Sequence, residues 1–114
     1  VLKSHTMLCL QEHKCKPTVL PAQELVNTKD TFTVAPQGVI VVRSRLSGDE
    51  IKLPGGTKAV KKLFIDRKIP AHQRMQIPVI ADDAGLLGVH DIGADQARMA
   101  AALPATQIHL EQLG

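Results

Sequence analysis

Residues Leu53 to Pro78 read LPGGTKAVKKLFIDRKIPAHQRMQIP, and this stretch decides the fold prediction. Pro54-Gly55-Gly56 interrupts a strand-like pattern, and Thr57 is a residue type that caps helix N-termini. A helix is therefore predicted over about 58–68. It must end before Pro70, because the residue that precedes a proline avoids the α region.

The predicted helix has two faces. At 100° per residue, Val60, Leu63 and Phe64 fall within one arc, which predicts that they face the core. Lysines 58, 61 and 62 fall together on nearly the opposite side, and Ile65 is the one apolar residue among them. After the helix, Pro70 can begin a single further turn.

Short strands are predicted along the rest of the chain. Apolar or alternating runs place them at 7–10, 31–34, 39–46, 50–53, 79–81, 86–89 and 107–110. The turn at 47–49 should return 50–53 beside 39–46, and Asp82–Gly85 is typical of a hairpin turn. Residues 93–102 are expected to be helical. No long helical crossover separates the strands, which favours antiparallel pairing.

The predicted fold class is α+β: a small sheet or sandwich of short antiparallel strands, with one amphipathic, lysine-bearing helix packed on it. With 114 residues, a single domain over 1–114 is the simplest expectation. The first residue is Val1 rather than Met, which indicates a fragment of a longer protein. No run approaches the roughly 20 apolar residues of a membrane span, so a cytoplasmic protein is expected.

Positive charge is concentrated in the middle of the chain. Between Arg43 and Arg74 there are nine basic and three acidic residues, a net charge of +6 within a chain whose total is +3. Such a cluster is either a polyanion footprint or a solvated lysine face. Phe32 and Phe64 are the only aromatic residues of the Phe, Tyr and Trp types. Because readers of single strands stack bases on such rings, a duplex is the better target.

Catalytic and metal motifs are weak. The spacing of Cys9 and Cys15, even with His5 and His13 nearby, matches no usual zinc site, and two reduced cysteines are the simpler interpretation. Residues 55–58 are not a Walker A loop, although a helix start beside lysines favours a phosphate. Asp82-Asp83 is far more typical of a turn than of a Mg²⁺ site. No metal or catalytic residue is predicted.

One ordered set of residues carries a family resemblance. The order Gly-Asp, Lys-x-x-Lys-Lys-x-Phe, Ile-Pro, Arg, Ile-Pro-Val occurs at Gly48-Asp49, Lys58, Lys61-Lys62, Phe64, Ile69-Pro70, Arg74 and Ile77-Pro78-Val79. It resembles the C-terminal domain of tRNA(Ile)-lysidine synthase, best over residues 39–102. The resemblance implies an α+β domain related to a module of the phenylalanyl-tRNA synthetase β subunit. Family copies often carry a tryptophan and charges at 71–73, and an aromatic residue with Pro-Gly near 90–93, and this chain departs from both patterns.

The resemblance also implies a function. The domain should bind the acceptor stem of an isoleucine tRNA through its phosphates, while a separate N-terminal catalytic domain uses ATP and Mg²⁺ to convert the wobble cytidine to lysidine. The catalytic Ser-Gly-Gly-x-Asp-Ser loop is absent from this sequence, so this chain is expected to have no ligase activity and no cofactor. The alternative is a free-standing structural or protein-interaction module. The predicted tRNA-binding residues are Arg43, Arg45, Lys58, Lys61, Lys62, Lys68 and Arg74.

Overall fold

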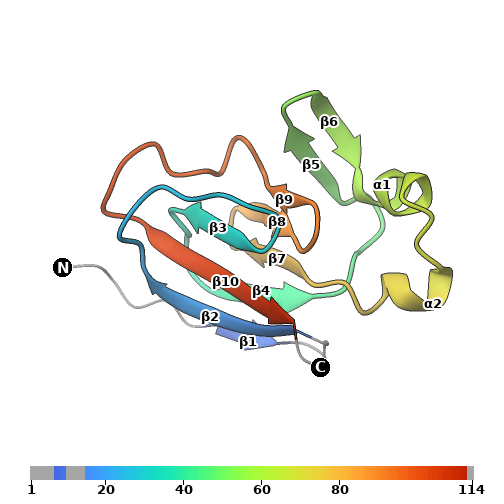
Figure 1. The fold of residues 1–114 in the computed structure, drawn as a ribbon, viewed down its shortest axis with the longest axis horizontal. Helices are drawn as coiled ribbons and strands as arrows, with labels where there is room; N and C mark the ends of the chain where they lie inside the picture. Colours follow the sequence, from blue (N-terminus) through green and yellow to red (C-terminus); the bar gives the residue numbers. More distant parts are fainter. Residues whose placement is uncertain (1–6, 10–14, 113–114) are drawn as a thin grey trace.

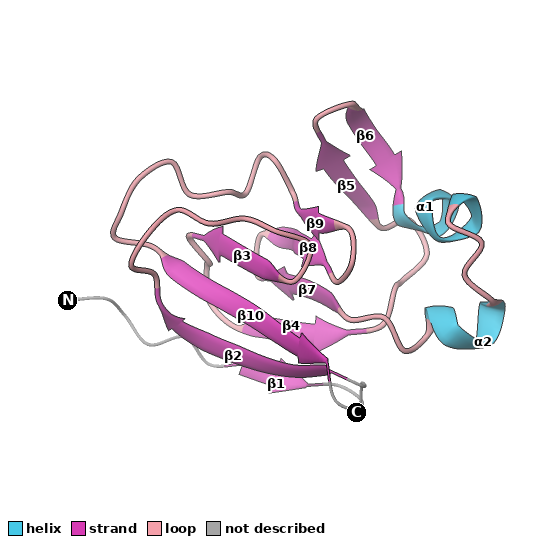
Figure 2. Cartoon of the chain, in the orientation of Figure 1, coloured by secondary structure: helices cyan, strands magenta, loops and turns pink. Residues whose placement is uncertain are grey.

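The computed structural model describes residues 7–9 and 15–112, and they form two sheets and a separate hairpin (Figures 1 and 2). One sheet has the order β1-β4-β7-β8-β9, and the other has the order β2-β10-β3. The strands of the first sheet are β1 (Met7–Cys9), β4 (Ile40–Arg43), β7 (Val79–Asp82), β8 (Gly85–Val89) and β9 (Gly93–Ala94). Those of the second are β2 (Cys15–Pro21), β3 (Thr31–Val34) and β10 (Thr106–Gln112).

The main core lies between these two sheets. Phe32, Ile108 and Leu110 from the smaller sheet belong to one buried cluster with Ile40, Val42, Ile80 and Leu87 from the larger sheet. In β4 the burial alternates, as expected for a strand with one face on the core. The predicted small domain of short antiparallel strands is therefore confirmed, apart from the parallel pair β1–β4. Apart from the Phe32 ring and the Cys15 thiol, the buried cluster is aliphatic.

Phe32 requires a neighbour without a side chain. A Cβ atom placed on Gly88 of β8 would lie 2.7 Å from the Phe32 ring and 2.9 Å from the Gly93 carbonyl oxygen. Only glycine leaves room for the ring at this point. Gly88 therefore fixes how closely the two sheets approach each other.

A second unit projects from one end of the sandwich (Figure 1). It consists of the hairpin strands β5 (Glu50–Leu53) and β6 (Gly56–Ala59), followed by α1 (Val60–Asp66) and α2 (Ala71–Arg74). Ile51, Val60 and Phe64 of this unit share a buried cluster with Val79 of β7 and Val89 of β8. The unit is thus attached to the larger sheet by its own small core.

The predicted helix over 58–68 is wrong at its start. Residues 56–59 form strand β6, paired with β5 in the register Leu53↔Gly56 to Glu50↔Ala59. Proline has the backbone φ that a tight turn requires, so Pro54-Gly55 closes a hairpin instead of ending the sheet. Thr57 is therefore not a helix cap, and the residue before α1 is Ala59, which makes no side-chain capping bond. The phosphate site expected at this helix start is lost with it.

The partner predicted for β5 is also wrong. Residues 50–53 pair with β6, whereas β4 pairs in parallel with β1 and antiparallel with β7. The strand predicted over 39–46 ends at Arg43. The parallel β1–β4 pair joins segments about thirty residues apart in the chain, a distance at which local patterns carry no information.

Residues 93–102 are not helical. After β9 the chain turns at Asp95, whose carboxylate accepts hydrogen bonds from the backbone N–H groups of Ala97 (2.8 Å) and Lys52 (3.0 Å). Aspartate competes with helix formation through such local bonds. By contrast, the hairpin around Asp82–Gly85, the strand at 31–34, the last strand and the single turn after Pro70 are confirmed.

Candidate nucleic-acid interface

Helix α1 presents two lysines to solvent. Val60 and Phe64, four positions apart, are fully buried, so the opposite side of this seven-residue helix faces outward. Lys61 and Lys62 lie on that side and are exposed. Ile65 is 48% exposed beside them, as its position in the sequence predicts. The helix is shorter than predicted, and of the three lysines assigned to it only Lys61 and Lys62 lie on it.

Lys58 lies in the projecting unit too, but on a strand and not on the helix. It is the third residue of β6, and it is exposed. The helical phase that groups it with Lys61 and Lys62 is therefore wrong, although all three lysines are exposed and lie within five residues of one another in the projecting unit.

Lys68 occupies a left-handed position directly after α1. Its φ is 57°, its N–H donates to the Ile65 carbonyl (2.9 Å), and the N–H of Ile69 donates to the Phe64 carbonyl (3.0 Å). This is the Schellman arrangement, in which glycine usually takes the left-handed position. The Ile69 side chain packs against the cluster that contains Phe64, as the motif requires. Lys68 is thereby held at the exposed end of the helix.

These lysines have no acidic partners in the part of the chain that is described. Within residues 15–112, no carboxylate lies within 4.0 Å of the ammonium groups of Lys58, Lys61, Lys62 or Lys68. An ammonium group that is exposed and unpaired is available to an anion from outside.

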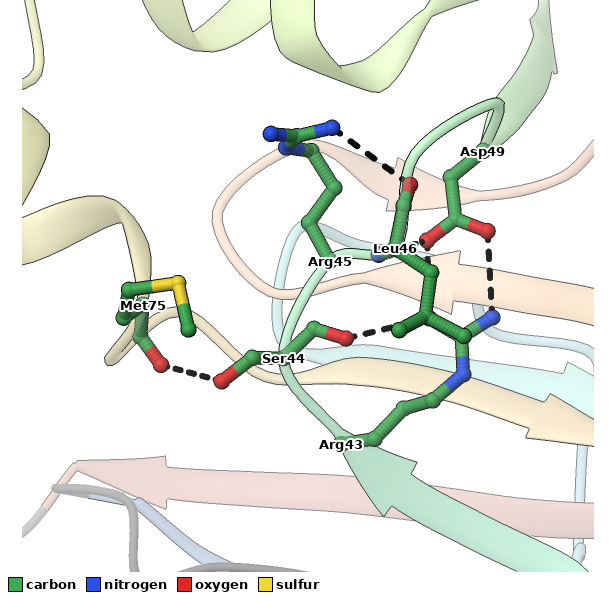
Figure 3. Close-up of polar contacts among 6 residues, drawn as sticks. All are labelled: Arg43, Ser44, Arg45, Leu46, Asp49 and Met75. Atoms are coloured by element: carbon green, nitrogen blue, oxygen red, sulfur yellow. Dashed lines mark hydrogen bonds and ion pairs between the residues drawn. The ribbon is translucent and has the colours of Figure 1, made fainter.

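Arg43, in contrast, is used inside the molecule. Its guanidinium donates to both carboxylate oxygens of Asp49, at 2.7 and 3.1 Å, and to the carbonyl of Ser44 at 3.1 Å (Figure 3). The Arg43 and Asp49 side chains are only 15% and 13% exposed. Arg43 therefore has little left to offer a phosphate.

Asp49 joins the end of β4 and the turn after it to the start of α1. Besides Arg43, its carboxylate accepts from the N–H of Leu46 (2.8 Å), and its carbonyl accepts from the N–H of Val60, the first residue of α1 (3.0 Å). Burial raises the pKa of Asp49, but the hydrogen bonds from Arg43 and Leu46 and the charges of Arg43 and Arg45 outweigh burial and hold the pKa below its ordinary value. Asp49 therefore holds the turn that precedes β5 in place.

Arg45 and Arg74 each make a contact with a backbone carbonyl. Arg45 lies beyond the end of β4, and Figure 3 shows its guanidinium apart from that of Arg43, near the Leu46 carbonyl (3.4 Å). Arg74 donates through Nε to the Ile69 carbonyl (2.8 Å) and links α2 to the end of α1. The Ser44 hydroxyl makes a similar link by donating to the Met75 carbonyl.

The prediction omitted Arg67, which is exposed at the end of α1 and adjoins Lys68. Its Nη1 donates to the Asp91 carbonyl (2.9 Å). Its place in the basic stretch between Arg43 and Arg74 is the sequence signal that points to it. The exposed basic surface of the projecting unit comprises Lys58, Lys61, Lys62, Arg67 and Lys68.

The acidic turn has a structural role. One Asp82 oxygen accepts from the N–H groups of Ala84 (2.9 Å) and Gly85 (3.1 Å), and the other accepts from Arg98 and from the N–H of Gln37 (2.7 Å). Burial opposes the ionisation of Asp82, but these bonds and the Arg98 charge leave its pKa below the ordinary value. The interpretation of 82–83 as a turn is therefore supported by positive contacts.

Metal-binding groups do not converge in the described residues. Within 7–9 and 15–112 there is no group of three or more His, Cys, Asp or Glu residues that could hold a metal ion. Cys15 is a buried free thiol 3.5 Å from Nδ1 of His90, and burial, aided by the charge of Asp91, raises its pKa. The site considered for His5 and His13 lies outside the described residues, as does the side chain of Cys9. No helix in the described part of the chain is long and apolar enough to cross a bilayer.

Comparison with known proteins identifies the family of this fold. A solved structure, the crystal structure of a TILS C-terminal domain, matches it with a TM-score of 0.65 and 24% sequence identity. The match covers 86% of this chain and 85% of the other. Over residues 40–111 the chain also matches the family model described as the TilS substrate C-terminal domain. The chain belongs to this family.

Similar sequences include proteins named tRNA(Ile)-lysidine synthase. The enzyme of Clostridioides difficile (strain 630) is 54% identical over 55 residues, which is 48% of this chain. That of Exiguobacterium sibiricum is 45% identical over 51 residues, which is 45% of this chain. In each case the match spans 12% of the relative's own length. The resemblance to the C-terminal domain of lysidine synthase is thus confirmed.

Proposed function

We propose that this chain is the tRNA-binding domain of a lysidine synthase and that it holds the acceptor stem of an isoleucine tRNA through its phosphates. The observation that carries the proposal is the exposed basic surface, whose four lysines have no carboxylate within 4.0 Å in the described residues. Exposed cations clustered at one end of a domain are the electrostatic footprint of nucleic-acid binding.

The burial of both aromatic rings favours a duplex as the target. Phe32 and Phe64 are fully buried, and the chain contains no Tyr or Trp. No exposed ring of these types is available as an open stacking platform for a single strand. Contacts from lysines to the phosphates of a stem position the RNA without reading its sequence.

The chemistry belongs to another part of the proposed enzyme. An N-terminal catalytic domain, with ATP and Mg²⁺, joins lysine to the wobble cytidine. The chain described above binds the tRNA during this reaction, and the enzyme acts in the cytoplasm. Of the predicted binding residues, Lys58, Lys61, Lys62 and Lys68 contact the phosphates of the stem, and Arg67, which was not predicted, contacts them as well. Arg45 contributes less to binding. Arg43 and Arg74 act by holding the projecting unit in position.

The test is a charge reversal of helix α1. In the double variant Lys61→Glu, Lys62→Glu, binding of an isoleucine tRNA transcript, measured by fluorescence anisotropy, should weaken strongly. The slope of log affinity against log salt should flatten by about 0.9 for each phosphate that is no longer neutralised, the value for B-DNA, with a similar scale for an RNA stem. Unchanged affinity and an unchanged slope would favour the alternative of a structural or protein-interaction module with a solvated lysine face.

A matched pair of single variants controls for net charge. Lys62→Gln and Lys16→Gln remove the same charge, but Lys16 is exposed on β2, away from the projecting unit. The proposal predicts weaker binding for Lys62→Gln and near-normal binding for Lys16→Gln. Equal losses in both variants would indicate a general charge effect and contradict the proposal.

A further inference from the structure

Two adjoining hollows lie beside the exposed basic surface. One has a volume of about 440 Å³ and the other about 330 Å³. Both are lined by Ile69, His90 and Asp91, so these residues form a common wall. Because Ile69 follows α1 and the other two follow β8, the groove runs where the projecting unit meets the sandwich.

Apolar side chains form part of the groove wall and suit the flat face of a base. Ile69 and Ile92 line the larger hollow, and both are partly buried. Phe64 also lines this hollow, although its side chain is buried. A base enclosed between aliphatic side chains needs no exposed aromatic platform, so the burial of both phenylalanines does not prevent binding here.

Asp91 supplies a fixed acceptor in this wall. Its φ is 67°, its N–H donates to the Lys29 carbonyl (2.9 Å), and its carbonyl accepts from Arg67 (2.9 Å). The main chain is thus held on both sides. The carboxylate is 57% exposed and lies 4.0 Å from Nδ1 of His90, whose side chain is only 9% exposed. A carboxylate accepts hydrogen bonds from the exocyclic amino group of a base.

Cations stand beside this acceptor. Lys29 and Arg67 are exposed and line the larger hollow. Arg67 also adjoins Lys68, so the groove is continuous with the exposed basic surface. A cationic margin around an acceptor and apolar walls is the arrangement that a nucleotide requires, because its phosphate is anionic and its base is flat with a polar edge.

We propose that this groove binds one unpaired nucleotide of an RNA whose stem lies on the exposed basic surface. Asp91 selects a base that carries an exocyclic amino group, so cytosine, adenine or guanine is accepted in preference to uracil. Lys29 and Arg67 contact the phosphate of the same nucleotide. This inference rests on the proposed RNA-binding function and adds a subsite to it.

The experiment uses the 114-residue chain and three RNA hairpins with the same stem. One is blunt, one carries a 3′ overhang of about four cytidines, and one carries a 3′ overhang of the same number of uridines. The cytidine overhang should bind about fivefold or more tightly than the other two, as expected for one good contact to a base edge. In the variant Asp91→Asn, this preference should fall to within about twofold, because the neutral amide reads the base differently.

Asp91→Asn is chosen because asparagine tolerates positive φ, so the backbone contacts to Lys29 and Arg67 are kept. An unchanged unfolding midpoint confirms that the fold of this variant is intact. The variant Arg67→Gln tests the groove without replacing Asp91. It should weaken binding of the cytidine overhang more than binding of the blunt hairpin. Equal binding of all three hairpins by the parent chain would overturn the inference and leave the proposed function standing. Absence of binding to any of them would overturn both.

A free nucleotide could make the same contacts in the groove as a nucleotide of an RNA. Competition by free cytidine monophosphate distinguishes these two ligands. If the groove serves RNA, the free nucleotide should compete only weakly with the cytidine overhang. If it binds as tightly as the overhang and the stem adds nothing, the groove is a site for a free nucleotide and the inference is overturned.

Discussion

The Arg43 guanidinium and the Asp49 carboxylate form a bidentate ion pair, with hydrogen bonds of 2.7 and 3.1 Å. The pair connects the end of β4 to the turn that precedes β5. The Asp49 carbonyl, in turn, accepts the first N–H of α1. The placement of the exposed basic surface therefore depends on an arginine that makes no direct contact with RNA in the proposed complex.

Removing the carboxylate should destabilise the domain. Asp49→Ala leaves a mostly buried guanidinium and the Leu46 N–H without their acceptor, so the free energy of unfolding should fall by about 2 kcal/mol. Urea unfolding measures the change. Asp66→Ala is the control, because Asp66 is exposed on α1 and has no ion pair among the described residues; its effect should stay within about 0.5 kcal/mol.

The same variant tests the role of Arg43. If Arg43 bound phosphate directly, its release from Asp49 would strengthen RNA binding at neutral pH. The structure predicts no such gain, because the released guanidinium loses its fixed position together with the turn. A rise in affinity for Asp49→Ala would show that the phosphate contact first expected of Arg43 exists.

Acid should destabilise the domain through two carboxyl groups. The pKa values of Asp49 and Asp82 lie below their ordinary value in the folded state. The unfolded chain, with an aspartate pKa of about 3.9, therefore binds more protons as the pH falls. The stabilisation is present above about pH 4 and is lost as the pH falls through the folded pKa values. Urea unfolding between about pH 7 and pH 2 should show this decline, and Asp82→Asn should make it shallower. A parent chain equally stable at both ends of this range would contradict the assignment.

A pair of glycines provides a test of packing between the sheets. Gly88→Ala should cost about 1–3 kcal/mol, because the added methyl group meets the Phe32 ring and a backbone oxygen at under 3.0 Å. Gly55→Ala adds the same group at a position where no heavy atom outside the neighbouring residues lies within 4 Å and where φ is not positive. Its stability should be near that of the parent, as measured by urea unfolding. Similar losses in both would show that the contact with Phe32 is not the cause.

The features that local sequence could predict are those determined by neighbouring residues. Asp82–Gly85 contains both its turn and its flanking strands, and the apolar spacing of Val60 and Phe64 correctly assigns them to a core. The start of α1 could not be predicted in the same way. Lys58 fits the helical phase by coincidence, and its pairing with Ile51 becomes visible only when the hairpin is known.

The candidate site shows the same limit. Sequence reveals that the middle of the chain is basic, but it does not reveal which cations are already paired. Arg43 and Lys61 are equally charged in the sequence, yet one is bound to Asp49 and the other is exposed. The groove at Asp91 was missed because its walls come from segments that are separated along the chain, with Arg67 and Ile69 on one side and His90 to Ile92 on the other.

Lys68 allows stability to be separated from RNA binding. Its left-handed conformation costs a residue with a Cβ atom about 1–2 kcal/mol, whereas glycine adopts it freely but loses more entropy on folding, by about 0.5–1 kcal/mol. Lys68→Gly should therefore leave the free energy of unfolding unchanged or raise it by up to about 1.5 kcal/mol. It should nevertheless weaken tRNA binding and flatten the salt dependence, because one cation of the exposed basic surface is removed.

Lys62→Gly is the matched control: it removes the same charge but places glycine inside α1, where it should cost about 1 kcal/mol. Thermal unfolding and anisotropy on both variants check the two readouts. A clear loss of stability in Lys68→Gly would contradict the Schellman assignment, and unchanged tRNA binding in both variants would contradict the role of this surface.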